Sequence, residues 1–187
     1  MKGIWIVLSF VVCAMGARAA DVTLQNPSFE AIDPSDAAKA TGWHPITETG
    51  EPPVSMVTQE DACDGTNSMK LAFASSKDGF IGLIQEVPVE PGQKLKFSGE
   101  FKKVELAEGS YLKLGIEWKR ADGGEVSRVQ DGDINAKTLV AGAWNRFEVA
   151  GAAPSGTAKA VFTITFYSGG KTSGAVLADK MVVETIK

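Results

Sequence analysis

The stretch Leu95-Lys96-Phe97-Ser98-Gly99-Glu100-Phe101-Lys102 decides the fold, because large apolar or small residues alternate with polar ones along its whole length. Neighbouring side chains of a β-strand point to opposite faces, so such a segment has one face for a core and one for solvent. The same period recurs in Leu112-Lys113-Leu114-Gly115-Ile116-Glu117-Trp118-Lys119 and in Phe162-Thr163-Ile164-Thr165-Phe166-Tyr167. These segments predict three strands that each bury one face.

Short segments with this period continue along the chain, and no long stripe of helical period interrupts them. Turn residues separate them, as in Pro91-Gly92, Asp122-Gly123-Gly124 and Ser168-Gly169-Gly170. About ten strands in one chain indicate an all-β, two-layer antiparallel β-sandwich. Residues 31–53 contain four prolines and a glycine-tryptophan pair and are expected to form a long surface connection. The expected strands cover residues 22–25, 54–58, 68–74, 81–88, 94–104, 111–119, 125–130, 145–150, 159–167 and 175–186.

The composition limits the function. The chain has 187 residues, of which 44% are hydrophobic and 22% charged, as expected for one globular domain. A net charge of −4 and a pI near 5.1 argue against nucleic acid or an anionic membrane as partner. The single histidine argues against a multi-histidine zinc site and against a histidine-centred catalytic dyad.

The N-terminal segment has the features of a secretory signal peptide. Lys2 gives it a positive start, Ile4 to Val12 are almost wholly apolar, and Ala17-Arg18-Ala19 is the small-x-small pattern that signal peptidase accepts. We therefore expect residues 1–19 to be removed and residues 20–187 to form a single domain that is secreted or periplasmic. Neither this run nor a later segment reaches the roughly 18 to 20 apolar residues of a membrane span.

The two cysteines cannot build a disulfide scaffold. Cys13 lies in the expected signal peptide, and the bulky Val12 before it argues against lipid modification. Cleavage of the signal leaves Cys63 without an intrachain partner, so we interpret it as a small apolar filler.

Six short motifs follow one another in a recognisable order. They are Asn26-Pro27-Ser28-Phe29-Glu30 with Gly42-Trp43; Asp64 to Leu71; Gln85 to Gly92; Ile116-Glu117-Trp118 with Ala121-Asp122-Gly123; Trp144 with Ala153-Pro154; and Leu177-Ala178-Asp179 before Val182-Val183-Glu184. In this order the chain resembles the CenC-type carbohydrate-binding modules of the CBM4/9/22 group. The resemblance implies a galactose-binding-like jelly-roll fold and a glycan ligand. It says less about the ligand than about the fold, since this sandwich serves many functions.

The resemblance also implies a structural calcium ion that ties the first strand to the last. Glu30 and Asp179 would provide its carboxylate oxygens, and the matching turn carbonyls lie near Ser28, Gly65 and Asn67. Calcium takes six to eight hard oxygen ligands, and these groups are suitable ones. The chain departs from the family in having Asp179-Lys180 where paired aspartates are common. The alternative is that both carboxylates pair with lysines or backbone donors.

The outward faces of the three diagnostic segments hold most of the candidate glycan-binding residues. Tyr167 is the first candidate for stacking on a sugar, because it shares its face with threonines rather than with the core residues. Phe80, in the loop before a strand, is the second. Polar groups expected to bond sugar hydroxyls in a shallow groove are Glu100, Lys113, Glu117, Arg128 and Thr165. Trp43, Trp118 and Trp144 are instead expected to belong to the core.

An enzyme is the less favoured class. Glu100 and Glu117 are expected to share an outward face on neighbouring strands, and glycoside hydrolases use two carboxylates about 5 to 9.5 Å apart. Lysines alternate with both glutamates, which is typical of a solvated sheet face and gives no burial to raise a carboxyl pKa. We therefore expect a secreted, non-catalytic carbohydrate-binding module. The alternative is a structural or adhesion protein that binds another envelope protein and has lost sugar binding.

Overall fold

The computed structural model describes residues 21–48, 54–73, 79–131, 134–169 and 174–187. The expected signal peptide lies outside these residues. The described part of the chain contains no helix, and hence none long and apolar enough to cross a membrane. Its strands are β1 (Ile32–Asp33), β2 (Asp36–Ala40), β3 (His44–Thr47), β4 (Val54–Thr58), β5 (Ser68–Phe73), β6 (Phe80–Pro88), β7 (Lys94–Leu106), β8 (Tyr111–Lys119), β9 (Glu125–Gln130), β10 (Ile134–Asn135), β11 (Trp144–Ala152), β12 (Lys159–Tyr167) and β13 (Gly174–Thr185).

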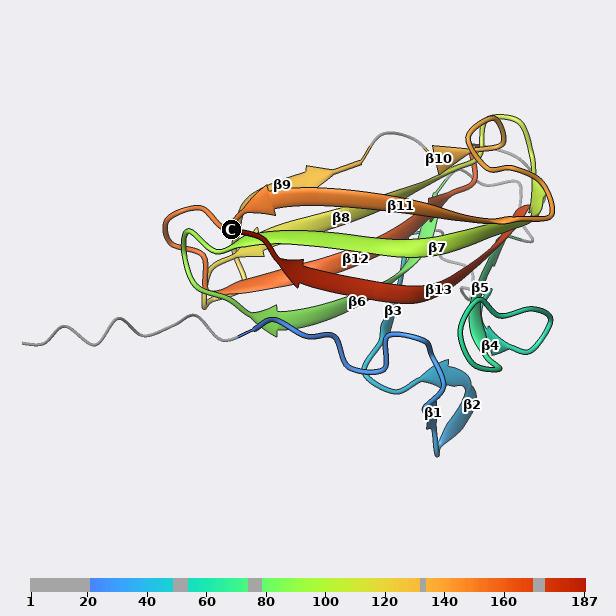
Figure 1. Ribbon diagram of the computed structural model, residues 1–187, viewed down its shortest axis with the longest axis horizontal. Coiled ribbons are helices and arrows are strands. Elements are labelled where there is room, and N and C mark those ends of the chain that lie inside the picture. The colour runs from blue at the N-terminus through green and yellow to red at the C-terminus, as the bar shows by residue number, and fades with distance from the viewer. Residues whose placement is uncertain (1–20, 49–53, 74–78, 132–133, 170–173) are drawn as a thin grey trace, which may run out of the picture.

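Two antiparallel sheets form the sandwich (Figure 1). Sheet B has six strands in the order β10-β8-β12-β6-β3, and β9 pairs with the same edge of β8 as β10 does. Sheet C has five strands in the order β11-β7-β13-β5-β4. In Figure 1 the strands of sheet C lie in front of those of sheet B, and the small hairpin of β1 and β2 projects below. The architecture confirms the predicted all-β sandwich.

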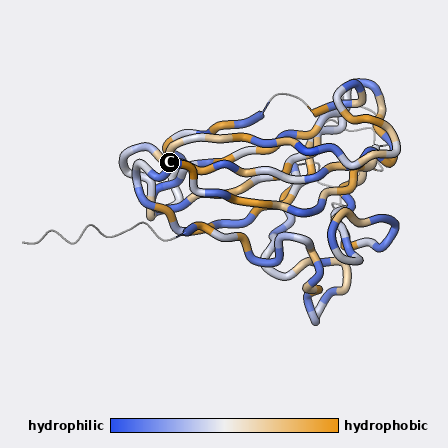
Figure 2. The backbone as a smooth tube through the Cα atoms, in the orientation of Figure 1, coloured by the Kyte–Doolittle hydropathy of each residue, from blue (hydrophilic) through white to orange (hydrophobic). Residues whose placement is uncertain are grey.

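Alternation along the strands builds the core between the two sheets, and Figure 2 shows apolar and polar residues succeeding one another along them. Phe97 of sheet C packs on Phe162 of sheet B, with ring centroids 5.1 Å apart. Met181 fills the space in front of Gly99, so a Cβ at this position would not fit. The inward residues predicted from the three diagnostic segments are buried: Leu95, Phe97, Phe101, Leu112, Leu114, Ile116, Trp118, Phe162, Ile164 and Phe166.

Nine of the ten expected strands are present, and the first is not. Residues 22–25 form no strand. The backbone N–H and carbonyl of Gln25 bond the side-chain amide of Gln85 and not the backbone of a neighbouring strand. The expected surface connection over residues 31–53 holds three short strands instead, and residues 49–53 of it lie outside the described part. β3 forms one edge of sheet B, where Pro45 pairs with Leu83. β2 lies against β4, one of the two edge strands of sheet C.

Candidate functional site

A groove of about 390 Å³ runs across the outward face of sheet B. Strands β3, β6, β8, β9 and β12 all contribute side chains to it. It contains five of the residues that the sequence suggested for glycan binding, namely Phe80, Glu117, Arg128, Thr165 and Tyr167. The remaining described residues that line it are Ile46, Thr47, Ile84, Lys119, Gln130, Val161 and Thr163. We call this the sheet B groove.

One end of the sheet B groove is aromatic. Tyr167 stands opposite Phe80 on β6 and opposite Tyr111 on β8, so the three rings form a row across the sheet. The centroids of Tyr167 and Tyr111 are 4.7 Å apart with planes only 12° from parallel, whereas Phe80 is tilted by 50° at 5.7 Å. Burial, and then the neighbouring Tyr111, raise the pKa of Tyr167. Because one face of Tyr167 is stacked on Tyr111, the row offers ring edges and hydroxyls more than an open ring face.

The other end of the sheet B groove is charged and internally paired. Arg128 donates to Glu125 through Nε at 2.8 Å and Nη2 at 2.5 Å, and its Nη1 lies 3.5 Å from Glu117. Hydrogen bonding to Glu125, the largest cause, raises the pKa of Arg128. Lys119 lies 3.4 Å from the other oxygen of Glu117. These contacts hold the guanidinium and the Glu117 carboxylate in defined positions, where both can bond hydroxyl groups of a ligand.

Small residues hollow out the floor between the two ends. Thr163 and Thr165 on β12 face Gly115 and Gly82 across the neighbouring strands. Thr163 is 3% exposed, and its hydroxyl has no hydrogen-bond partner among the described residues. A Cβ on Gly115 would lie 2.6 Å from that hydroxyl oxygen. Lys113, which the sequence also suggested, is not among the described lining residues: it pairs with Thr165 across the strands, and its Nζ is 5.5 Å from the centre of the Tyr111 ring.

Glu100 does not belong to this site, which corrects the sequence-based prediction. Glu100 lies on β7 in sheet C and Glu117 on β8 in sheet B, because the chain changes layer at the turn between these strands. The two outward faces therefore point away from each other across layers about 10 Å apart. The prediction of neighbouring strands was wrong because alternation reveals which face a residue occupies but not which sheet. The two glutamates cannot form the carboxylate pair of a glycoside hydrolase.

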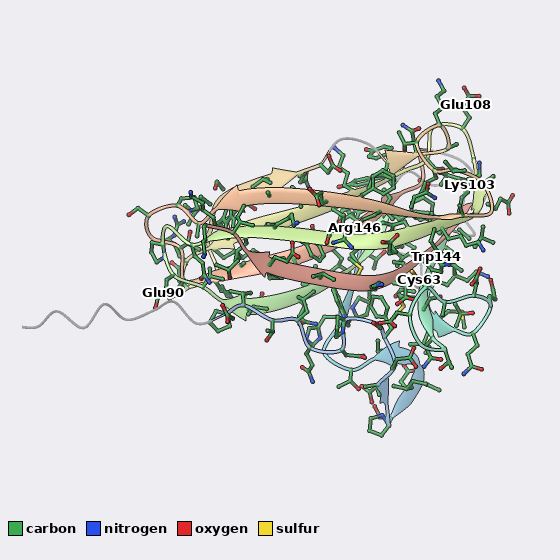
Figure 3. All side chains as sticks on the ribbon, in the orientation of Figure 1. Cys63, Glu90, Lys103, Glu108, Trp144 and Arg146 are labelled. Atoms are coloured by element: carbon green, nitrogen blue, oxygen red, sulfur yellow. The ribbon has the colours of Figure 1, made fainter. Side chains whose placement is uncertain are left out.

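Ion pairs cover the outward face of sheet C around Glu100. Arg146 lies 3.8 Å from Glu100 and donates to the Ser98 hydroxyl at 2.8 Å. Further along, Lys96 pairs with Glu184, and Lys102 pairs with Asp61 of the loop that precedes β5. Figure 3 shows Trp144 and Arg146 on this side of the molecule, near Cys63 of the same loop.

The candidate calcium residues converge on that loop. Glu30 accepts hydrogen bonds from the amides of Thr66 at 2.9 Å and Asn67 at 2.7 Å, and Gly65 packs directly against its carboxylate. The Asn67 amide, as the largest cause, lowers the pKa of Glu30. Ser28 donates its hydroxyl to Asp64 at 2.8 Å. The turn that holds Glu30 is thereby tied to residues 64–67.

Asp179 on β13 is fully buried beneath the same loop. Its Oδ2 accepts the amides of Cys63 at 2.7 Å and Asp64 at 2.9 Å, and its Oδ1 accepts the amide of Lys180 at 2.6 Å. Burial, the largest cause, raises the pKa of Asp179 above its ordinary value. The carboxylate pins the loop onto sheet C, at the bulge where β13 shifts register against β7.

These residues do not fit a calcium site in the arrangement described. Calcium needs six to eight converging oxygens. Here N–H donors converge on Glu30 and Asp179 instead, and the described residues contain no group of three or more acidic, histidine or cysteine side chains suited to a metal. The contacts correspond to the alternative of pairing with backbone donors. Calcium binding stays a prediction.

The tryptophans differ from one another in burial. Trp118 and Trp43 are buried, and Trp43 packs on Phe29 with centroids 5.3 Å apart, as expected for core residues. Trp144 is only partly buried, and it points outward from β11 opposite Lys102. Its placement in the core was therefore wrong. Tyr111 and Thr163 were missed as site residues, although both lie at outward positions of expected strands. Strand register places Tyr111 directly opposite Tyr167, and Thr163 lies on the same face of β12 as Tyr167.

Comparisons with known proteins support the fold class. No protein-family model matches the sequence, and no curated protein does. Solved structures do: the xylan-binding CBM22-1 domain of Paenibacillus barcinonensis Xyn10C is 18% identical with a TM-score of 0.60, covering 91% of this chain and 99% of that one. TmCBM61, solved with β-1,4-galactotriose, is 15% identical with a TM-score of 0.56, covering 87% of this chain and 97% of that one.

A third neighbour is much longer. The enzymatically active domain of tailspike protein 4 of bacteriophage CBA120 is 13% identical with a TM-score of 0.63, and the match covers 87% of this chain but 21% of that one. The chain thus has the β-sandwich of carbohydrate-binding modules, which also occurs as a part of longer enzymes. At these identities the likeness concerns the fold, and the function must be argued from the groove.

Proposed function

We propose that this protein binds a glycan in the sheet B groove without altering it chemically. The observation that carries the proposal is the grouping of Tyr167, Phe80, Thr165, Glu117 and Arg128 in one groove on a sheet face. Aromatic side chains at one end suit the apolar C–H faces and edges of sugar rings. Fixed charged groups at the other end suit their hydroxyls, since charge-assisted hydrogen bonds are the stronger ones.

The groove combines apolar and polar walls. Thr163 lies in its floor, where its buried hydroxyl has no hydrogen-bond partner among the described residues. Around it Ile46, Ile84 and Val161 give the groove apolar walls. Polar and charged side chains make up most of the rest of the lining, so the groove combines apolar surface with placed polar groups, as small-ligand sites do.

The number and placement of carboxylates support binding without chemistry. Of the described residues that line the groove, Glu117 is the single acid, and two cations hold it within 3.5 Å. Glycoside hydrolysis in its usual form needs a second carboxyl group opposite the first.

The structural or adhesion role stays the alternative, in which the sandwich serves as a surface for another protein. The two roles differ in what a binding face should contain. A groove lined by half-buried aromatic residues, such as Tyr167 and Phe80, favours the glycan, whereas a flat lysine-rich face beside an apolar edge would favour a protein.

Affinity electrophoresis tests the proposal on the purified domain of residues 20–187. The panel consists of xylan, β-1,4-galactan, mixed-linkage β-glucan and an unrelated α-glucan. We expect saturable retardation by at least one polymer, and loss of most of it in Tyr167→Ala because the aromatic row is broken. The matched control is Trp144→Ala, which removes a partly buried aromatic from the opposite sheet and should leave retardation unchanged. Absence of retardation by every polymer, with a folded and monodisperse protein, contradicts the proposal.

A further inference from the structure

A second hollow of about 570 Å³ lies beyond the aromatic row, at the end of the sandwich where Figure 3 labels Glu108. It is formed by the end of β7, the turn into β8, and β10 with the turn that follows. Its described lining residues are Leu106, Glu108, Gly109, Ser110, Tyr111, Asn135, Ala136 and Lys137. None of them was among the residues that the sequence suggested, and we call this the end hollow.

Strand register joins the end hollow to the sheet B groove. Phe80, Tyr167, Tyr111 and Asn135 are directly opposite one another on β6, β12, β8 and β10. Directly opposed residues of antiparallel strands point to the same side of the sheet. The four side chains therefore form one row across the sheet, spanning three strand spacings or about 14 Å. The first two line the groove, and the last two line the end hollow.

The walls of the end hollow are held in place. Ser110 is buried and donates its hydroxyl to the Ser168 carbonyl at 2.7 Å. Asn135 accepts the Lys137 amide through Oδ1 at 2.9 Å, and its own carbonyl accepts the amides of Thr138 and Leu139. Hydrogen-bonded turns therefore form the hollow. Like the sheet B groove, it is lined by both apolar and polar residues.

From this continuity we infer that the ligand is a linear oligosaccharide that occupies both hollows and crosses the Tyr111–Tyr167 pair. The inference rests on the proposed function and adds the end hollow as a second binding subsite. Each hollow alone has the size of a small-ligand site, which is about 300–1,000 Å³, so a short sugar fills only one of them. Sugar residues on the far side of the tyrosines contact Lys137 and Glu108, whose side chains are exposed.

Chain length provides the test. Affinities are measured by calorimetry for β-1,4-linked xylo-, galacto- and gluco-oligosaccharides of two to six residues. Wild-type affinity should rise with length for the series that binds. Ala136→Trp, which fills the end hollow, should lower affinity for the longest oligosaccharide about tenfold and leave the shortest one unchanged. Ala150→Trp, at an exposed position of β11 in sheet C, is the matched control and should resemble wild type.

Lys137→Ala is a second test in case Ala136→Trp fails to fold, because the Lys137 side chain is exposed and has no part in the core. It should also weaken only the long oligosaccharides, about threefold. Affinity that is independent of length, or variants that equal wild type at every length, overturns the inference while the proposed function stands. A wild-type protein that binds no oligosaccharide and no polymer of the panel overturns both.

Discussion

Glu117 and Glu100 make a natural pair for comparison. Their side chains are 17% and 16% exposed, each stands on the outward face of a sheet, and each has an arginine within 4 Å. Around Glu117 the sheet surface is hollowed by glycines and threonines, with an aromatic row at one end. Around Glu100 it is covered by ion pairs, by Trp144 and by the loop that Asp179 anchors. The two glutamates thus have similar chemistry in different surroundings, and the proposed function places binding on the face of Glu117 only.

The largest expected effect concerns the face of Glu100. Asp179→Ala leaves three backbone amides without their acceptor and should lower the free energy of unfolding by about 3 kcal/mol. Urea denaturation measures it. Glu148→Ala, an exposed residue 3.8 Å from Lys96 on the same face, is the control and should cost less than about 0.5 kcal/mol. Equal small losses in both variants would mean that the loop is not held by Asp179.

The next effect separates the two glutamates themselves. Glu117→Ala should weaken glycan binding five- to tenfold, or about 1–1.4 kcal/mol, because it removes a hydrogen-bonding group and one of the two anionic neighbours of Arg128. Glu100→Ala should leave the affinity unchanged, and both variants should lose similar, small amounts of stability. Titration calorimetry and thermal melts on the two proteins give these numbers. A loss of affinity in Glu100→Ala alone would move the binding site to sheet C.

A smaller effect appears in the pH dependence of stability. Glu30 has a pKa below its ordinary value of 4.5, so its carboxylate stabilises the fold above that pH and loses this contribution as pH falls through the lowered pKa. The stability difference between wild type and Glu30→Gln should be complete at pH 6 and shrink below pH 4.5. Denaturation curves between pH 3 and 7 measure it. A difference that stays constant over this range would contradict the role of the Thr66 and Asn67 amides.

The smallest expected effect is that of calcium. Because N–H donors already occupy Glu30 and Asp179, the melting temperature should differ by less than about 1 °C between calcium and a chelator. Differential scanning calorimetry in the two buffers measures this difference in melting temperature. A clear rise with calcium would show that the ion binds the folded protein, as the family resemblance implies, and would give this side of the molecule a ligand of its own.

Most of the fold could be predicted because burial imposes alternation. Apolar and polar residues alternate in residues 94–104, 111–119 and 159–167. Only a strand with one inward face buries the apolar side chains and exposes the polar ones, and the inward side chains form the core. Alternation is silent about sheet membership, so it could not separate Glu100 from Glu117. The end hollow was also beyond prediction, because it depends on the pairing of Asn135 with Tyr111, two short segments far apart in the sequence.

The edges of the sandwich have a consequence for the protein at high concentration. Unpaired edge strands tend to recruit strands of other molecules and so to start aggregation. β3, at one edge of sheet B, contains Pro45, which lacks the N–H that a new partner strand would need. At one edge of sheet C, β2 lies against β4. Replacing Pro45 by valine should therefore promote self-association, with the groove left intact.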